Sequence, residues 1–141
     1  MPRVRGRLIE APRDALVERL KASFPNEVAA IQAYFAACRE AQAAAFTLFA
    51  ASAMPAPLAA IMRWIHSNRV RRALNTTTAD ASAMRNSQLA ALLAARWGAY
   101  GVPPARSPLA LHALVTGSYL GGAFFPIGGP AQFARAFSAA I

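Results

Sequence analysis

The feature that most constrains the fold of this sequence is a long helical pattern of apolar residues that ends near Ala53. It follows Phe24-Pro25-Asn26-Glu27, which is typical of a helix start because proline is tolerated in the first turn and Glu27 suits the positive end of the helix dipole. Apolar residues then recur at steps of three and four, which places them on one side of a helix. These residues are Val28, Ile31, Tyr34 or Phe35, Cys38, Ala41 or Gln42, Ala45 and Phe49. Such a stripe must be covered by other parts of the chain.

Proline, glycine and capping residues divide the rest of the chain into shorter helices. The pattern predicts helices near 12–22, 58–66, 76–84, 87–97, 108–120 and from Pro130 to the end. Arg69, Arg71 and Arg72 crowd a predicted turn. Ala123-Phe124-Phe125 is short and aromatic enough for a strand. The predicted fold class is mostly α, with six or seven helices and at most a short strand near 123–125.

Length and residue counts exclude several classes of chemistry. The 141 residues suit one domain, which we divide into a basic N-terminal lead (1–10), expected to be loosely held, and a helical region (11–141). One cysteine excludes an internal disulfide framework. Because His66 and His112 are the only histidines and lie on separate predicted helices, no metal site is expected. No GxGxxG or Walker motif occurs, so this chain by itself should not hold a dinucleotide.

The chain is basic, with a net charge of +9 from fifteen Lys and Arg against six Asp and Glu. Arg3, Arg5 and Arg7 alternate at the N-terminus, but no recognised nucleic-acid module accompanies them, so no nucleic-acid partner is expected. Two segments without formal charge, 41–62 and 107–134, are interrupted by proline or glycine and are poor candidates for membrane spans. Charges after the basic N-terminus argue against a secretory signal. A cytoplasmic protein, with peripheral membrane contact as a further option, is the expectation.

The segment 97–130 carries the residues of greatest functional interest. Its glycines alternate with aromatic residues, so backbone can approach a ligand between flat apolar walls. His112 and Tyr119 share one face of the predicted helix 108–120, and Arg106 precedes that helix. Spacing alone leaves two interpretations open: a ligand-facing pair, or a hydrogen-bonded histidine and a packed tyrosine at a helix interface.

The run LLAARWGAYGVPPARSPLALHALVTGSYLGGAFFPIGGPAQFARAF closely resembles an internal region of a family of FAD-dependent oxidoreductases. That family includes carotenoid (phytoene) desaturases, carotenoid isomerases and all-trans-retinol 13,14-reductases. In it, a YG-x-PP-x-RS segment leads to a helix bearing a histidine, and a glycine and aromatic segment opens the following helix. FPNEVAAIQAYFAACREA also looks like the family's long helix. The resemblance covers roughly residues 11–141 and implies the substrate domain of a flavoenzyme that acts on a long apolar polyene or similar lipid.

The resemblance also implies site residues, although which of them touches a ligand stays open and no catalytic residue is assigned. The implied substrate-binding residues are Tyr100, Arg106, His112, Tyr119, Phe124 and Phe125. Gly128 and Gly129 are implied to lie near the FAD.

The sequence departs from the family in lacking its dinucleotide-binding segment, and family members run several times longer. We therefore expect a split partner, a truncated reading frame or an excised domain. In each case the chain is an incomplete piece of an α+β flavoprotein substrate domain and inactive alone. Its expected partner is the missing FAD-binding portion, in the same or a separate chain. Partly bare apolar helix faces predict homo-oligomers or poor solubility. The alternative function is a stand-alone basic helical protein that binds an anionic membrane surface or a helical partner, centred on Arg63, Trp64 and the predicted arginine turn.

Overall fold

The computed structural model describes residues 7–8, 13–120 and 124–139. The described residues form eight α-helices and two very short strands. The helices are α1 (Arg13–Ser23), α2 (Val28–Ser52), α3 (Ala56–Ile65), α4 (Ser67–Asn75), α5 (Thr78–Ala81), α6 (Ser87–Ala94), α7 (Leu109–Leu120) and α8 (Ala131–Ser138). Two 3-10 helices, η1 (Pro25–Glu27) and η2 (Ala95–Ala99), and two strands, β1 (Arg7–Leu8) and β2 (Phe124–Phe125), complete the described elements. The mostly α class is confirmed, and β2 is the short strand that the sequence predicts.

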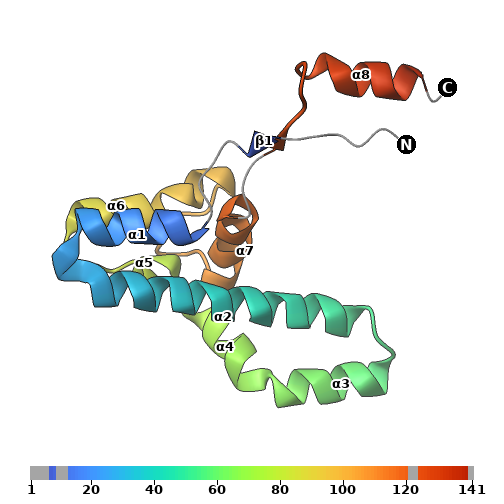
Figure 1. The fold of residues 1–141 in the computed structure, drawn as a ribbon. Coiled ribbons are helices and arrows are strands. Elements are labelled where there is room, and N and C mark those ends of the chain that lie inside the picture. The colour runs from blue at the N-terminus through green and yellow to red at the C-terminus, as the bar shows by residue number, and fades with distance from the viewer. Residues whose placement is uncertain (1–6, 9–12, 121–123, 140–141) are drawn as a thin grey trace.

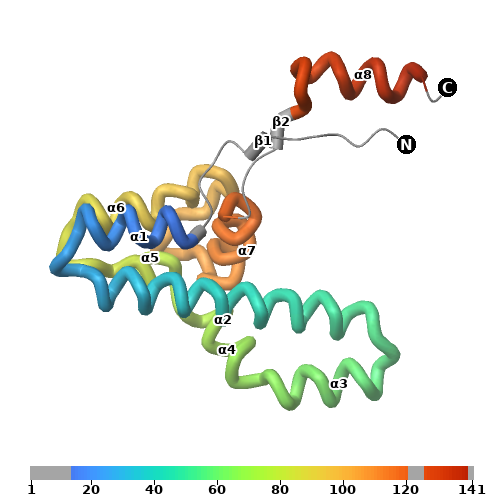
Figure 2. The backbone as a smooth tube through the Cα atoms, viewed as in Figure 1, coloured from blue at the N-terminus to red at the C-terminus, as the bar shows by residue number. Residues whose placement is uncertain are grey.

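The central element is α2, which runs across the molecule as Figures 1 and 2 show. Its residues as far as Ala45 pack among α1, α4 and α7, whereas its C-terminal end extends outward beside α3. The buried residues of α2 in the main core are Ile31, Tyr34, Phe35, Cys38, Ala41, Ala44 and Ala45. They meet Leu89 and Leu93 of α6 and the first turns of α7. The predicted apolar stripe is therefore confirmed as far as Ala45, but its last member, Phe49, is exposed.

The arginine-rich segment 67–75 is a helix, α4, and the predicted turn is wrong. The segment contains no glycine or proline, and arginine is a good helix former. Val70 and Ala73, three residues apart, join the core on one side of α4, and Ala73 is buried. Packing of this narrow apolar side outweighs the crowding of the arginines. Helix α4 is the reason that eight α-helices are described instead of six or seven.

The loop before α7 is held by backbone hydrogen bonds to the segment around α5. The N–H of Thr78 donates to the carbonyl of Ser107 at 2.9 Å, and the N–H of Leu109 donates to the carbonyl of Thr76 at 2.8 Å. Thr78 and Ser107 are both fully buried. The start of α7 therefore has a defined place in the bundle, although the preceding loop contains little regular structure.

A two-stranded antiparallel ribbon joins β1 to β2, with Arg7 opposite Phe125 and Leu8 opposite Phe124. Two residues of the predicted loose lead, 1–10, are thus paired strand, which corrects that expectation for 7–8. Residues 1–6, including Arg3 and Arg5, lie outside the described residues. None of the described helices is both long and apolar enough to cross a membrane.

Two leucines of α6 test this account of the core. Leu89 is fully buried, whereas Leu92 on the same helix is more than half exposed. We expect Leu89→Ala to lower the free energy of unfolding by about 2–5 kcal/mol, because it removes buried methyl groups and leaves a cavity. The matched control, Leu92→Ala, should change it by less than about 0.5 kcal/mol. Urea unfolding followed by circular dichroism measures both, and equal effects would contradict the assigned orientation of α6.

Candidate functional site

His112 on α7 lies fully buried at the centre of a hydrogen-bonded cluster. Its Nε2 is 2.7 Å from the Tyr34 hydroxyl and 3.2 Å from Thr116 Oγ1, and its Nδ1 is 3.0 Å from the Tyr100 hydroxyl. The Tyr34 hydroxyl also donates to the carbonyl of Leu93 at 3.1 Å. The cluster thus joins α2, α6, α7 and the loop at Tyr100.

The hydrogen bonds determine where the imidazole carries its proton. A phenol has one hydrogen, and that of Tyr34 is directed to the Leu93 carbonyl. The Tyr34 oxygen can therefore only accept from His112, which places the ring hydrogen on Nε2. Nδ1 then accepts from the Tyr100 hydroxyl. Both ring nitrogens of the neutral imidazole are satisfied.

Electrostatics favour the same neutral form. Burial lowers the pKa of His112, and the positive charge of Arg96 lowers that pKa further. Burial also raises the pKa of Tyr34 strongly, with the nearby Cys38 adding to the effect. At neutral pH the cluster therefore carries no charge, and its donors and acceptors hold the helices in register.

A small apolar cavity adjoins this cluster. It has a volume of about 150 Å³ and lies between α1, α2, α6 and α7. Its lining residues are Leu16, Leu20, Tyr34, Phe35, Leu92, Leu93, Arg96, Thr116 and Leu120. Tyr34 and Thr116 belong to both the cluster and the cavity wall. The guanidinium of Arg96 also lies 4.4 Å from the ring centre of Tyr119, which is 47% exposed, so a cation–π pair stands near one side of the cavity.

The structure brings together only some of the residues that the sequence singles out. Tyr100 and His112 are in contact, and His112 is the hydrogen-bonded histidine of the second interpretation rather than an exposed ligand-facing group. Tyr119, by contrast, is exposed and lies against Arg96. Arg106 is exposed, and within the described residues its side chain makes no hydrogen bond or ion pair.

The remaining predicted site residues follow α7. Phe124 and Phe125 form β2, but their side chains lie outside the described part of the structure. Gly128 and Gly129 form a turn before α8, with φ angles of 90° and 86° that favour glycine. Ile127 and Gly128 are exposed, so this turn is open to approach.

Sequence reasoning missed three members of the site: Tyr34, Arg96 and Thr116. Tyr34 lies on the apolar stripe of α2 and looks like an ordinary core residue. Thr116 follows His112 by four residues, so helical spacing was a usable signal for it. Arg96 carried no signal, because its role depends on the distance between two separate elements.

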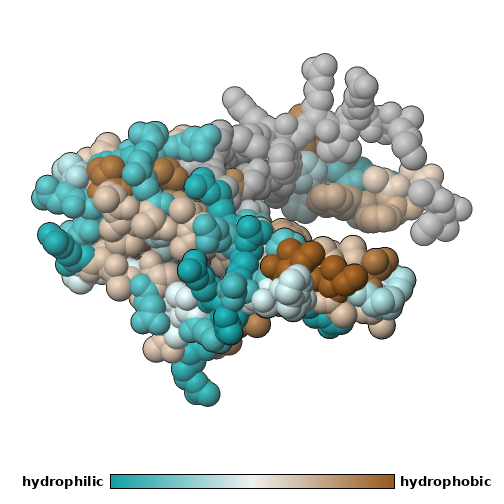
Figure 3. Space-filling view, turned by 90° about the horizontal axis from the view of Figure 1, so that it is seen from below, coloured by the Kyte–Doolittle hydropathy of each residue, from teal (hydrophilic) through white to brown (hydrophobic). Residues whose placement is uncertain are grey.

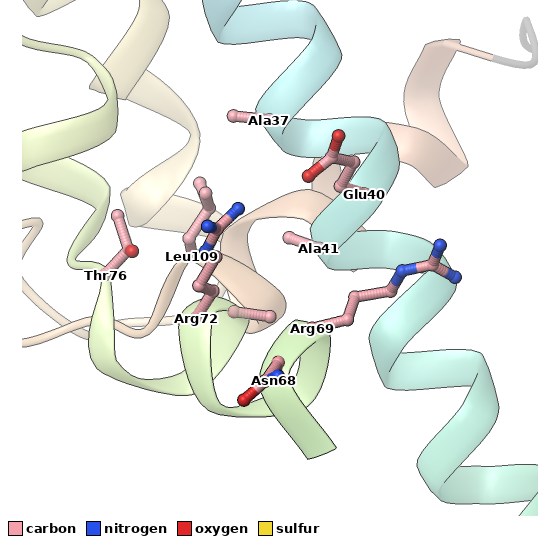
Figure 4. A pocket seen from close by; sticks show the side chains of 9 residues that line it. Ala37, Glu40, Ala41, Asn68, Arg69, Arg72, Thr76 and Leu109 are labelled. Carbon is pink, nitrogen blue, oxygen red and sulfur yellow. The ribbon is translucent and has the colours of Figure 1, made fainter. Parts of the chain in front are cut away.

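A larger open groove lies elsewhere, between α2 and α4, and Figure 4 shows its lining. Its volume is about 490 Å³, and Glu40 from α2 and Asn68, Arg69 and Arg72 from α4 lie around it. This groove is polar and open, in contrast to the apolar cavity beside His112.

Fold and site together define a mostly α-helical protein with a neutral buried Tyr–His–Tyr cluster beside an apolar cavity. No protein-family model matches this chain, and no solved structure matches it. It is 29% identical to the all-trans-retinol 13,14-reductase of Danio rerio over 132 residues, which are 89% of this chain and 22% of that protein. It is 29% identical to the Macaca fascicularis protein of the same name and 28% identical to the Homo sapiens one, over 126 residues in each case. The chain spans about a fifth of the length of these relatives.

The buried histidine predicts a specific pH dependence of stability. The unfolded chain takes up a proton on His112 near pH 6.5, but the folded protein resists this because its His112 pKa is lowered. Unfolded protein therefore binds more protons below that pH, and the free energy of unfolding should fall as pH decreases, by at most about 1.4 kcal/mol per pH unit. Urea titrations between pH 7.5 and 5.5 measure this loss.

Two variants assign the effect. His112→Gln should remove the pH-dependent loss above pH 5.5, since no imidazole is then buried. His66→Gln is the matched control because it retains His112, and it should keep the loss. A loss that persists in His112→Gln and disappears in His66→Gln would show that the wrong histidine was assigned.

Proposed function

We propose that this chain forms the substrate-binding portion of an FAD-dependent oxidoreductase of the desaturase, saturase or isomerase type. The substrate is a long apolar polyene or a similar lipid. The FAD is held by polypeptide other than these residues, either in the same protein or in a separate chain.

The observation that carries this proposal is the similarity to the all-trans-retinol 13,14-reductases, which extends over 85–89% of this chain. The name of those relatives indicates an apolar polyene alcohol as their substrate. An apolar cavity lined mainly by leucine and aromatic side chains is chemically suited to such a molecule. The cavity is smaller than the roughly 300–1,000 Å³ of typical ligand pockets, so it would take one end of a long substrate.

In this proposal the Tyr–His–Tyr cluster positions the cavity wall. His112 does not face the substrate, because it is fully buried and both ring nitrogens are engaged. It holds Tyr34 at the wall, while Tyr100 closes the opposite side of the imidazole. Tyr119 and Arg96 stand at the exposed edge, where an aromatic face and a cation can orient the polar end of a substrate.

The described residues do not fit a complete FAD site. A dinucleotide-binding turn joins a strand to a helix through glycines. Among the described residues, the segment nearest in form runs from β2 through Gly128 and Gly129 to α8. The turn lacks the three-glycine spacing, and Pro130 at the start of α8 has no N–H to offer a phosphate. We therefore place Gly128 and Gly129 at the edge that faces the flavin-binding portion.

FAD, where bound, supplies the hydride or electron transfer of this class of enzyme. The contribution of this chain is to bind the apolar substrate, to exclude water from it and to orient it. These tasks need a rigid and mainly apolar wall, which the neutral cluster and the leucine side chains provide, with Arg96 as the one charged side chain of the lining.

Binding of all-trans-retinol tests the proposal directly. Leu92 lines the cavity and is exposed enough to be replaced without loss of core packing. We expect the chain to increase retinol fluorescence saturably, and Leu92→Gln to weaken binding by about tenfold, because it places a polar amide at the apolar wall. Leu74→Gln on α4 is the matched control, since Leu74 is similarly exposed but does not line the cavity.

Two results would overturn the assignment: no saturable retinol binding, or equal weakening by both variants. The same preparation mixed with FAD alone should show no bound flavin with a shifted absorbance spectrum. Stoichiometric, tight FAD binding by this chain would contradict the placement of the FAD site in other polypeptide.

A further inference from the structure

A two-helix arm, formed by residues 43–65, extends away from the bundle. It consists of residues 43–52 of α2, the connection at Met54-Pro55 and all of α3, and Figure 1 shows it projecting beyond α7. Large apolar side chains are exposed along its whole length. They are Phe46, Phe49, Met54, Leu58, Ile61, Trp64 and Ile65.

Helix α3 presents its apolar side to solvent, and its one charged residue, Arg63, is exposed as well. Leu58, Ile61 and Ile65 are spaced by three and four residues, so they form one stripe, and all three are more than half exposed. Ala59 is buried instead, on the side of α3 that contacts α2. Trp64, adjacent to the stripe, is 79% exposed. A contiguous apolar face of this kind marks an interaction surface.

All formal charges within residues 41–79 are positive, and the nearest carboxylate, that of Glu40, lies at the groove with Arg69 and Arg72. Residues 41–62 carry no formal charge, and no Asp or Glu occurs between Glu40 and Asp80. Four arginines, Arg63, Arg69, Arg71 and Arg72, follow directly along α3 and α4. In the described part of the chain the one ion pair joins Lys21 to Glu18, so none of these arginines is neutralised by a carboxylate.

The apolar and cationic regions are neighbours on one face of the molecule. Figure 3 shows a brown apolar patch over α3 with hydrophilic side chains beside it, toward α4. Arg69 and Arg72 project from α4 at the groove in Figure 4. An apolar stripe with exposed tryptophan and adjoining cations matches a bilayer interface, where acyl chains lie next to anionic headgroups.

We propose that the arm docks on anionic membranes, with the apolar stripe of α3 entering the interface and the arginines of α4 against lipid phosphates. α3 has ten residues and is about 15 Å long, so it can lie in the plane of the interface along its full length. The arm contacts one leaflet and does not span the bilayer. This inference is independent of the proposed oxidoreductase function, because docking needs neither flavin nor polyene.

Fluorescence of Trp64 tests the proposal. The chain has two tryptophans, so Trp97→Phe leaves Trp64 as the only reporter. With vesicles of phosphatidylcholine and phosphatidylglycerol, we expect a blue shift of Trp64 emission and quenching by brominated acyl chains. Neutral phosphatidylcholine vesicles should bind more weakly. Raising salt from about 0.1 M to 1 M should reduce binding to anionic vesicles, because the Debye length falls from about 10 Å to 3 Å.

Surface variants separate the two contributions. Ile61→Ser with Ile65→Ser should abolish the blue shift and reduce vesicle sedimentation at least tenfold. Arg69→Gln with Arg72→Gln should weaken binding to anionic vesicles on the order of thirtyfold without affecting neutral ones, since each cation contributes about 1 kcal/mol near an anionic surface. The matched control is Phe133→Ser with Phe137→Ser, which removes two exposed aromatic residues from α8 and should leave binding unchanged. Circular dichroism confirms that each variant is folded.

Several outcomes would overturn the proposal. Binding that depends on Phe133 and Phe137 and not on Ile61 and Ile65 would assign the contact to α8. A discrete dimer that buries Trp64 and leaves vesicles unbound would make a second copy of this chain the occupant. Equally tight binding of a single-stranded oligonucleotide, unaffected by Ile61→Ser with Ile65→Ser, would assign the arginines to nucleic acid.

Discussion

The hydrogen bond between Tyr34 and His112 joins the two helices on whose packing the rest of this structure depends. A buried imidazole is costly unless both nitrogens are paired, so α2, α7 and the loop at Tyr100 must meet in one arrangement. Gly117, farther along α7, faces Gln42 so closely that a Cβ would overlap the glutamine side chain. The polar cluster therefore fixes the approach of α7 to α2, and a side chain at position 117 would require the amide group of Gln42 to move aside.

The molecule divides its apolar residues between two uses. One set fills the core and lines a cavity beside the neutral cluster, where a mainly apolar wall suits an apolar ligand. The other set covers the outside of the α2–α3 arm, next to four arginines. α2 contributes to both, because its residues as far as Ala45 are enclosed by other helices, whereas the rest of the helix carries the exposed Phe46 and Phe49. A long helix with a single apolar pattern thus serves a core at one end and a surface at the other.

Much of the secondary structure was accessible from local signals. Asn86 caps α6, its side chain accepting from the N–H groups of Gln88 and Leu89, and Thr77 caps α5 by accepting from the N–H of Asp80. The sequence did not indicate a helix at 67–75, because only two of its residues, Val70 and Ala73, face the core and the arginines dominate the pattern. In the site, Tyr100 and His112 both belong to the glycine and aromatic segment 97–130, which the sequence singles out. Tyr34 and Arg96 carry no local sign of their roles.

The sequence by itself determined the helical class, the caps, the long stripe on α2 and the short strand at 124–125, since each depends on residues only a few positions apart. Tertiary structure decided which part of that stripe is enclosed, because coverage depends on where α1, α6 and α7 pack. It also decided the protonation and isolation of His112, whose partner Tyr34 is 78 positions away in sequence. Contacts over such separations arise only when helices pack, and no periodicity within one helix encodes them.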